Sequence, residues 1–224
     1  NAFAVGLNGE PLKPINAGSW KFSKNPNYSN QNTPNLHFHD MSVAQKFLVE
    51  RYGINDVPSV GHRELFFDIE CEIGGALTEE YIQRAPMPIT SIAWWDKKAD
   101  EWAIIILDRK NQLKDIKLEN KKVIACSTEK ILLKKFVEII RDIDPDILIG
   151  YNSDYFDVPY LYHRMCNVIG KDWADQLSPV GQVQSKAYTK YFFRKDQFVK
   201  IIGVESLDYM RLHKKYSWKD EPSW

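Results

Sequence analysis

The segment that decides the fold is Leu65-Phe66-Phe67-Asp68-Ile69-Glu70, an apolar run interrupted by two carboxylates. Its residue types predict a strand over roughly 63–72 in the core of a sheet. Because side chains alternate along a strand, Asp68 and Glu70 would share one face, about 7 Å apart. Two carboxylates on a buried face repel, and a divalent cation between them would offset the repulsion. An edge strand with a solvated acidic face is the alternative.

Apolar patterns on both sides of this segment predict the rest of the fold. β-branched and aromatic runs predict strands, and helical spacing of apolar residues predicts helices. The predicted strands cover 88–95, 102–107 and 146–151, and the predicted helices cover 43–52, about 129–144 and 159–170. The last strand follows a helix, so it would join the sheet by a crossover. This order predicts an α/β fold with a mixed sheet.

A second group of polar residues, Tyr151–Asp157, follows the predicted strand at 146–151. Ligands of α/β sheets bind at the carboxyl ends of strands, so this loop is a candidate site. Asp157 precedes a helix with Pro159 in its first turn, and N-capping is the simpler interpretation of its side chain. Asp154 is expected to be a solvated loop residue.

Composition limits the classes of function. The chain has 224 residues with 44% apolar and 13% aromatic content, which argues against disorder. Thirty basic residues balance thirty acidic ones, so any nucleic-acid contact must come from local patches. No apolar run is long enough to span a membrane. The spacing of Cys71, Cys126 and Cys166 argues against a zinc finger and predicts buried, reduced thiols, and the His37–His39 pair is expected on the surface.

Two motifs resemble those of a known family. The first and second exonuclease motifs of family B DNA polymerases are similar to Phe-Asp-Ile-Glu at 67–70 and to Tyr-Asn-x-x-x-Phe-Asp-x-Pro-Tyr-Leu at 151–161. Residues 42–53 and 203–218 resemble segments near these motifs in polymerases of T-even bacteriophages. The likeness is clear over about 42–224 and weak over 1–41.

The resemblance implies a ribonuclease-H-like exonuclease domain over 63–224, preceded by a partial N-terminal domain and linker over 1–62. It implies two-metal hydrolysis at the primer 3′ end, with Asp68, Glu70 and Asp157 as catalytic residues and ligands of Mg²⁺ or Mn²⁺. The positions that would bind substrate are Asn152, Phe156 and Tyr160. Phe156 would stack on a terminal base, although packing in the core is an equally good interpretation.

Residues 187–203 are predicted to form a hairpin with a four-residue polar turn at 194–197. By resemblance, this hairpin helps to part primer from template during transfer to the exonuclease site. The residues that would contact DNA there are Tyr191, Phe193, Arg194 and Lys195.

The family's third motif, Tyr-x-x-x-Asp, has one match near the C-terminus, Tyr216–Asp220, which we interpret as a polar turn outside the site. The sequence begins at Asn1 without Met and is interpreted as a piece of a polymerase, truncated before its third carboxylate, with weak or no activity alone. The expected partners are single-stranded DNA or a primer 3′ end, the dNMP product, the missing polymerase domains and a sliding clamp, with no membrane. The expected location is the cytoplasm. If the protein is encoded by a phage, this is the cytoplasm of the host cell.

Two other functions stay open at this point. One is a stand-alone exonuclease of the same acidic class, against which the flanking helix and the hairpin argue. The other is a domain that binds single-stranded nucleic acid without cleaving it. Interleaved aromatic and basic residues at 186–195 would suit such a domain, since bases stack on aromatic rings and phosphates pair with cations.

Overall fold

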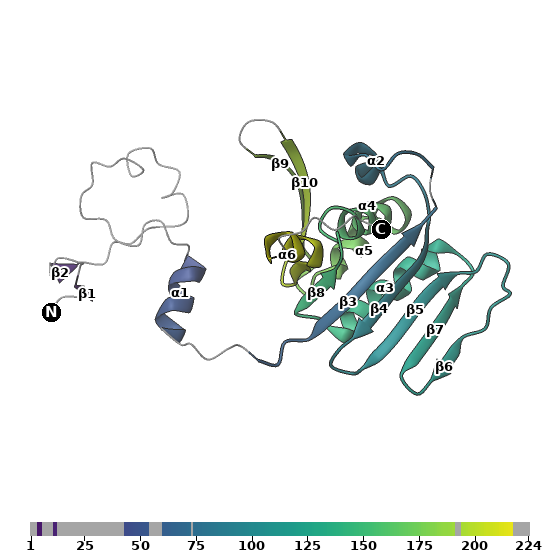
Figure 1. Ribbon diagram of the computed structural model, residues 1–224, viewed down its shortest axis with the longest axis horizontal. Helices are drawn as coiled ribbons and strands as arrows, with labels where there is room; N and C mark the ends of the chain where they lie inside the picture. The colour runs from purple at the N-terminus through teal and green to yellow at the C-terminus, as the bar shows by residue number, and fades with distance from the viewer. Residues whose placement is uncertain are drawn as a thin grey trace. The chain divides into compact units, whose positions relative to one another are not determined.

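The computed structural model describes residues 4–5, 11–12, 43–53, 60–72, 74–190 and 194–216, with the backbone alone for some of them, including 186–190 and 194–198 (Figure 1). The chain divides into two compact units, Asn1–Ser59 and Val60–Trp224, and each is described by itself. The assignment of domains to 1–62 and 63–224 stays a prediction.

The described residues of the first unit form a short strand pair and one helix. Strands β1 (Ala4–Val5) and β2 (Pro11–Leu12) pair antiparallel. Helix α1 (Val43–Tyr52) confirms the helix predicted at 43–52. It is followed by Gly53, whose φ of 57° lies in the left-handed region that glycine adopts without strain.

Seven strands of the second unit form one mixed sheet in the order β11-β8-β3-β4-β5-β7-β6. Their bounds are β3 (Glu64–Cys71), β4 (Ile89–Asp96), β5 (Glu101–Leu107), β6 (Ile116–Leu118), β7 (Lys121–Cys126), β8 (Ile147–Gly150) and β11 (Glu205–Asp208). β3 lies inside the sheet, antiparallel to β4 and parallel to β8, which is in turn parallel to β11. The predicted α/β fold with a mixed sheet is therefore confirmed.

Strand β3 alternates between the core and the opposite face of the sheet. Leu65, Phe67 and Ile69 are buried, whereas Asp68 and Glu70 are exposed. This alternation confirms that the two carboxylates share one face, but that face is exposed and not buried as predicted.

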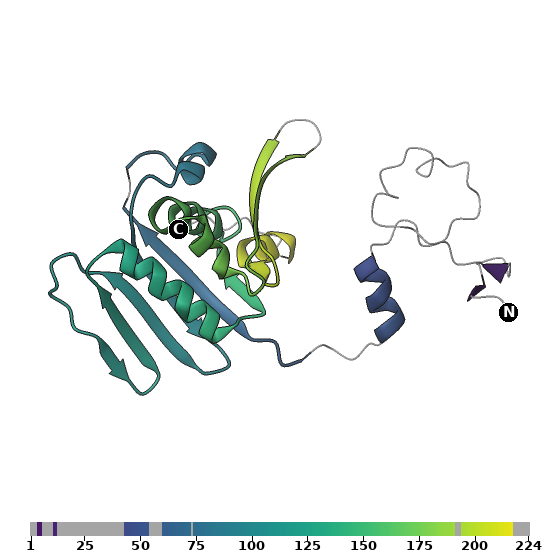
Figure 2. The ribbon, with the colours of Figure 1, turned by 180° about the vertical axis from the view of Figure 1, so that it is seen from behind.

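The helices of the second unit are α2 (Glu79–Arg84), α3 (Glu129–Ile143), α4 (Asp157–Ile169), the short α5 (Lys171–Ala174) with the 3₁₀ turn η2 (Asp175–Leu177), and α6 (Tyr209–Tyr216). Helix α3 begins where predicted, because the Thr128 hydroxyl accepts a hydrogen bond from the Ile131 N–H. Figure 2 shows α3 lying against one face of the sheet. The buried face of α3 meets that sheet, with the Phe136 ring 6.0 Å from the Trp94 ring.

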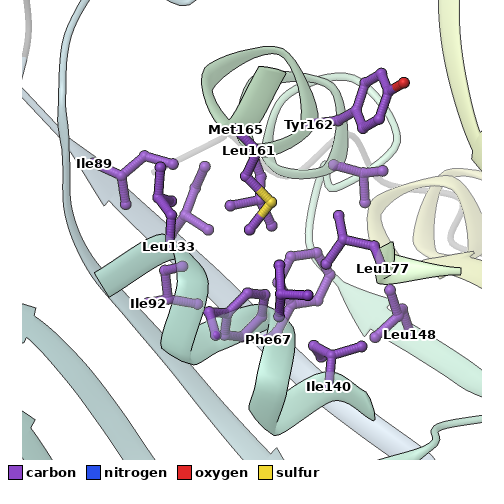
Figure 3. Packing of buried hydrophobic residues seen from close by; sticks show 14 of the residues in the cluster. Phe67, Ile89, Ile92, Leu133, Ile140, Leu148, Leu161, Tyr162, Met165 and Leu177 are labelled. Carbon is purple, nitrogen blue, oxygen red and sulfur yellow. The ribbon is translucent and has the colours of Figure 1, made fainter. Parts of the chain in front are cut away.

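The hydrophobic core lies between the sheet and helices α3 and α4. Phe67 and Ile92 come from strands, Leu133 from α3, and Leu161 and Met165 from α4 (Figure 3). This core holds β3 and the start of α4 in a fixed relation, and both carry predicted site residues.

Some elements were not predicted from the sequence. The β6–β7 pair lies at one edge of the sheet; β6 has only three residues, and the apolar run of β7 is only four residues long after two lysines. Helix α2 has six residues and none of them is buried. β11 has four residues and depends on its pairing with β8.

The predicted hairpin is present, but its turn lies elsewhere. Strands β9 (Val183–Lys190) and β10 (Arg194–Ile201) pair antiparallel, with Arg194 opposite Lys190. Residues 194–197 therefore belong to β10, and 191–193 connect the strands, which corrects the predicted turn. The physical reason is that Val183, Val199 and Ile201 at the base of the hairpin are buried. Their burial fixes the register, and polarity alone could not reveal it.

Candidate functional site

Asp157 is the first residue of α4, and its side chain does not cap the helix. Phe156 occupies the N-cap position without a side-chain hydrogen bond. Asp157 Oδ1 instead accepts a hydrogen bond from the Ile69 N–H of β3 at 3.1 Å. β8 pairs with β3 only as far as Phe66, so the edge of β3 beyond that point is open to this contact. The N-cap interpretation is therefore wrong.

The negative charge of Asp68 acts on the buried Asp157. Asp157 is buried, and its pKa is raised from its usual 3.8 to about 7, first by burial and also by the negative charges of Asp68 and Asp208. The hydrogen bond from Ile69 opposes this rise. Partial desolvation of the Asp68 carboxylate also raises its pKa, although the residue as a whole is exposed. The ends of β3, β11 and the β8–α4 connection thus bring acidic groups together.

The full set of three predicted ligands is not assembled in the described residues. Glu70 lies exposed on the same face as Asp68, two residues further along β3. Within the described ranges, no three His, Cys, Asp or Glu side chains are grouped so as to hold a metal ion. The role of Asp68, Glu70 and Asp157 as joint ligands therefore stays a prediction.

The loop between β8 and α4, residues 151–156, differs from the expectation for Asp154. Asp154 is 8% exposed, so the predicted solvated residue is in fact buried. Its carboxylate accepts hydrogen bonds from the Ser206 hydroxyl at 2.6 Å and from the Arg211 guanidinium at 2.8 Å. Both partners lie more than fifty positions later in the chain, so no local pattern could have revealed them.

Two of the three predicted substrate-binding residues, Asn152 and Phe156, lie in the β8–α4 loop, and their role stays a prediction. Asn152 is part-buried in the β8–α4 loop with a φ of 61°. Phe156 is part-buried, packs against the core and stacks on Tyr160 with ring centroids 5.4 Å apart.

Tyr160 is placed differently from the expectation, because it is fully buried. Its hydroxyl donates to the Met87 carbonyl at 2.8 Å and accepts from the Met87 N–H at 3.1 Å. In this structure Tyr160 therefore connects α4 to the start of β4 and has no surface open to a substrate.

Several other predicted residues have no described side chain. Tyr191, Phe193 and the His37–His39 pair lie outside the described residues, as does Asp220. Arg194 and Lys195 are described as backbone in β10.

All three cysteines are free thiols, and Cys126 is buried while Cys71 and Cys166 are half-buried.

The raised pKa of Asp157 predicts a pH-dependent stability without metal. Between about pH 4 and pH 7 the folded state holds a proton on Asp157 that the unfolded state releases, so stability falls as pH rises. We expect the unfolding free energy of the wild-type chain to fall by on the order of 3 kcal/mol across this window. Asp157→Asn cannot titrate at this position, so its unfolding free energy should lack this decrease. Urea unfolding in EDTA at pH 4.5 and 7.5 measures it. Parallel pH curves for both proteins would contradict the assigned environment of Asp157.

The comparisons with known proteins identify the family. Residues 15–223 match the family described as DNA polymerase family B, exonuclease domain. The chain belongs to this family, as its two motifs predicted.

Individual relatives agree with this family assignment. The DNA-directed DNA polymerase of Escherichia phage RB69 is 33% identical over 43% of this chain, and that of Enterobacteria phage T4 is 33% identical over 42%. A DNA polymerase of Pyrococcus glycovorans is 33% identical over 56% of the chain. These matches cover 10% of each phage polymerase and 14% of the Pyrococcus enzyme.

In the described part of the chain, none of the helices is both long and apolar enough to cross a membrane.

Proposed function

We propose that this chain is the proofreading 3′→5′ exonuclease region of a DNA-directed DNA polymerase. The observation that carries the proposal is the position of Asp157, whose buried carboxylate is bonded to β3 next to Asp68. The strand order β11-β8-β3-β4-β5, with β3 parallel to β8 and antiparallel to β4, is consistent with the ribonuclease-H-like fold that we propose.

The chemistry of these side chains fits divalent cations. Asp68 and Asp157 are neighbouring carboxylates whose ionisation is disfavoured without a counterion, and Glu70 follows on the face of Asp68. Hard oxygen ligands favour Mg²⁺ or Mn²⁺ over zinc. Asp68, Glu70 and Asp157 would hold two ions, which would lower the charge barrier to attack at the 3′-terminal phosphodiester and to departure of the 3′ oxygen.

The residues around the carboxylates have supporting roles in this proposal. The Ile69 N–H holds one oxygen of Asp157, so the carboxylate keeps a fixed direction. Asn152 would contact the terminal nucleotide, and Phe156 would stack on its base. The product would be a dNMP. The other proposed partners are the remaining polymerase domains and a sliding clamp, in the cytoplasm.

The hairpin would help to separate the primer end from the template. In β10, Arg194 and Lys195 follow the connection at 191–193, so that end of the hairpin would contact DNA through cations and through the Tyr191 and Phe193 rings. A test by shortening must therefore alter 191–193, since removing 194–197 would delete half of β10.

We also propose that these 224 residues alone cleave slowly. Of the three proposed ligands, Asp68 and Asp157 are the pair brought into electrostatic contact, and a complete two-ion site needs further oxygen ligands. A third carboxylate from a Tyr-x-x-x-Asp motif elsewhere in the polymerase would complete it.

The proposal is tested with 5′-labelled single-stranded DNA, Mg²⁺ or Mn²⁺, and the chain in excess, so that slow release can be measured. Products that shorten by single nucleotides from the 3′ end support an exonuclease. A mobility shift that persists without products would favour a domain that binds DNA without cleaving it.

A further inference from the structure

Asp208, the last residue of β11, is a buried carboxylate surrounded by backbone N–H groups. It is 3% exposed and lies opposite Gly150, the last residue of β8. Its Oδ1 accepts hydrogen bonds from the N–H groups of Asn152 and Met210, each at 2.9 Å, and its Oδ2 accepts from the Asp154 N–H at 3.3 Å. One side chain therefore connects the β8–α4 loop to the start of α6.

The β8–α4 loop needs such support, because its conformation is not regular. Asn152 has a φ of 61°, which a non-glycine residue adopts at a cost. In this conformation its carbonyl accepts hydrogen bonds from the N–H groups of Tyr155 and Phe156 at 3.1 and 3.0 Å. The Asp208 carboxylate accepts a hydrogen bond from the part-buried N–H of Asn152.

Asp154 provides a second connection between the same two segments. Its carboxylate binds the Ser206 hydroxyl in β11 and the Arg211 guanidinium in α6. The segment 206–211 thus holds the loop in two ways. Asp208 accepts hydrogen bonds from the loop backbone, and Ser206 and Arg211 donate hydrogen bonds to the Asp154 side chain of the loop. The loop leads directly into Asp157, and the Val158 N–H donates to the Ser153 carbonyl at 3.0 Å.

Asp208 is not itself placed as a ligand. Its two oxygens already accept three backbone hydrogen bonds. A metal ion would have to compete with all three, so its part is to hold the loop in place.

We infer that Asp208 is a positioning residue for the exonuclease site: by fixing the β8–α4 loop, it places the Asp157 carboxylate against the Ile69 N–H of β3. The metal-binding part of this inference rests on the proposed function. The geometric part does not, because the hydrogen bond between Asp157 and Ile69 exists without metal. Segment 206–211, which follows the hairpin in sequence, is therefore part of the site's support.

The test compares Asp208→Asn with Asp96→Asn. An asparagine offers a single acceptor oxygen to three N–H donors, so at least one hydrogen bond is lost. Asp96 is the control, since it is also 3% exposed and accepts two backbone N–H bonds, from Lys98 and Ala99, in the β4–β5 turn. It also pairs with Arg63, so exchange in its variant is compared relative to global stability.

Amide hydrogen exchange of Ile69 is the first measurement, in EDTA. We expect exchange of the Ile69 N–H to be about tenfold faster or more in Asp208→Asn and unchanged, relative to global stability, in Asp96→Asn. If Asp208→Asn does not fold, Ser206→Ala removes one of the two hydrogen bonds to the Asp154 carboxylate, and a smaller increase is expected. Unchanged Ile69 exchange in the folded variants would overturn the inference.

The second measurement is the Mn²⁺ concentration that gives half of the maximal rise in melting temperature. We expect Asp208→Asn to raise it about 10-fold or more and Asp96→Asn to leave it unchanged. Faster Ile69 exchange with an unchanged Mn²⁺ midpoint would overturn the metal-binding part of the inference. A wild-type chain without any response to Mn²⁺ would count against the proposed function, and the Ile69 measurement would still decide the geometric part.

Discussion

Asp68→Ala is expected to lower the rate of single-nucleotide release from single-stranded DNA about 100-fold or more. Asp68 is the proposed ligand whose charge acts on Asp157, and its removal would leave the proposed cations without a central carboxylate at the step where charge develops. Single-turnover assays with Mn²⁺, using chain in excess over labelled DNA, measure the loss.

The fold of Asp68→Ala should be unharmed. Asp68 is exposed, and its charge disfavours ionisation of the buried Asp157, so its removal relieves repulsion. We expect an unchanged or higher melting temperature in EDTA. Asp142→Ala, which removes an exposed carboxylate from α3, is the matched control and should keep the full rate. A rate for Asp68→Ala within threefold of that control would remove Asp68 from the site.

Arg164→Ala is expected to cost the largest amount of stability, about 3 to 5 kcal/mol. The Arg164 guanidinium is mostly buried and pairs with Glu129 at 2.7 Å, and it also donates to the carbonyls of Ala85 and Pro86. Glu129 in turn accepts from the Ile89 N–H. Removing Arg164 leaves the mostly buried Glu129 carboxylate without its counterion and breaks the contacts through which Arg164 of α4 binds α3 and the segment before β4.

The control for Arg164→Ala is Arg84→Ala. Arg84 pairs with Glu80 at 3.9 Å, and both side chains are more than 70% exposed. An exposed pair of this kind contributes under about 0.5 kcal/mol. Chemical denaturation of the two variants measures the difference. Equal stabilities would contradict the assigned buried ion pair.

Local patterns predicted the central part of the fold. The alternation of Leu65, Phe67 and Ile69 indicates a strand with Asp68 and Glu70 on its other face, and the structure agrees. The cap at Thr128 and the apolar spacing after it likewise predicted α3. These signals lie within a few residues of one another, so they can be read from the sequence alone.

The rest depended on partners distant in sequence. The Asp157 side chain bonds to β3, 88 positions earlier, so its proximity to a helix start was misleading. Burial of Asp154 requires Ser206 and Arg211, and the place of the hairpin turn follows from buried residues at its base. Tyr160 belongs to the second motif, at 151–161, but it is buried and its hydroxyl is hydrogen-bonded to Met87. Motif membership indicated the region of the site without deciding which side chains are exposed in it.

The central claim is that Asp68, Glu70 and Asp157 hold divalent cations at the end of β3. Paramagnetic broadening of amide NMR signals by Mn²⁺ tests it most directly, because the effect falls steeply with distance from the ion. We predict that substoichiometric Mn²⁺ selectively broadens the amides of 67–70 and 152–158, and that Asp68→Ala loses this pattern. Broadening centred on other acidic residues, or the same pattern in Asp68→Ala, would contradict the claim.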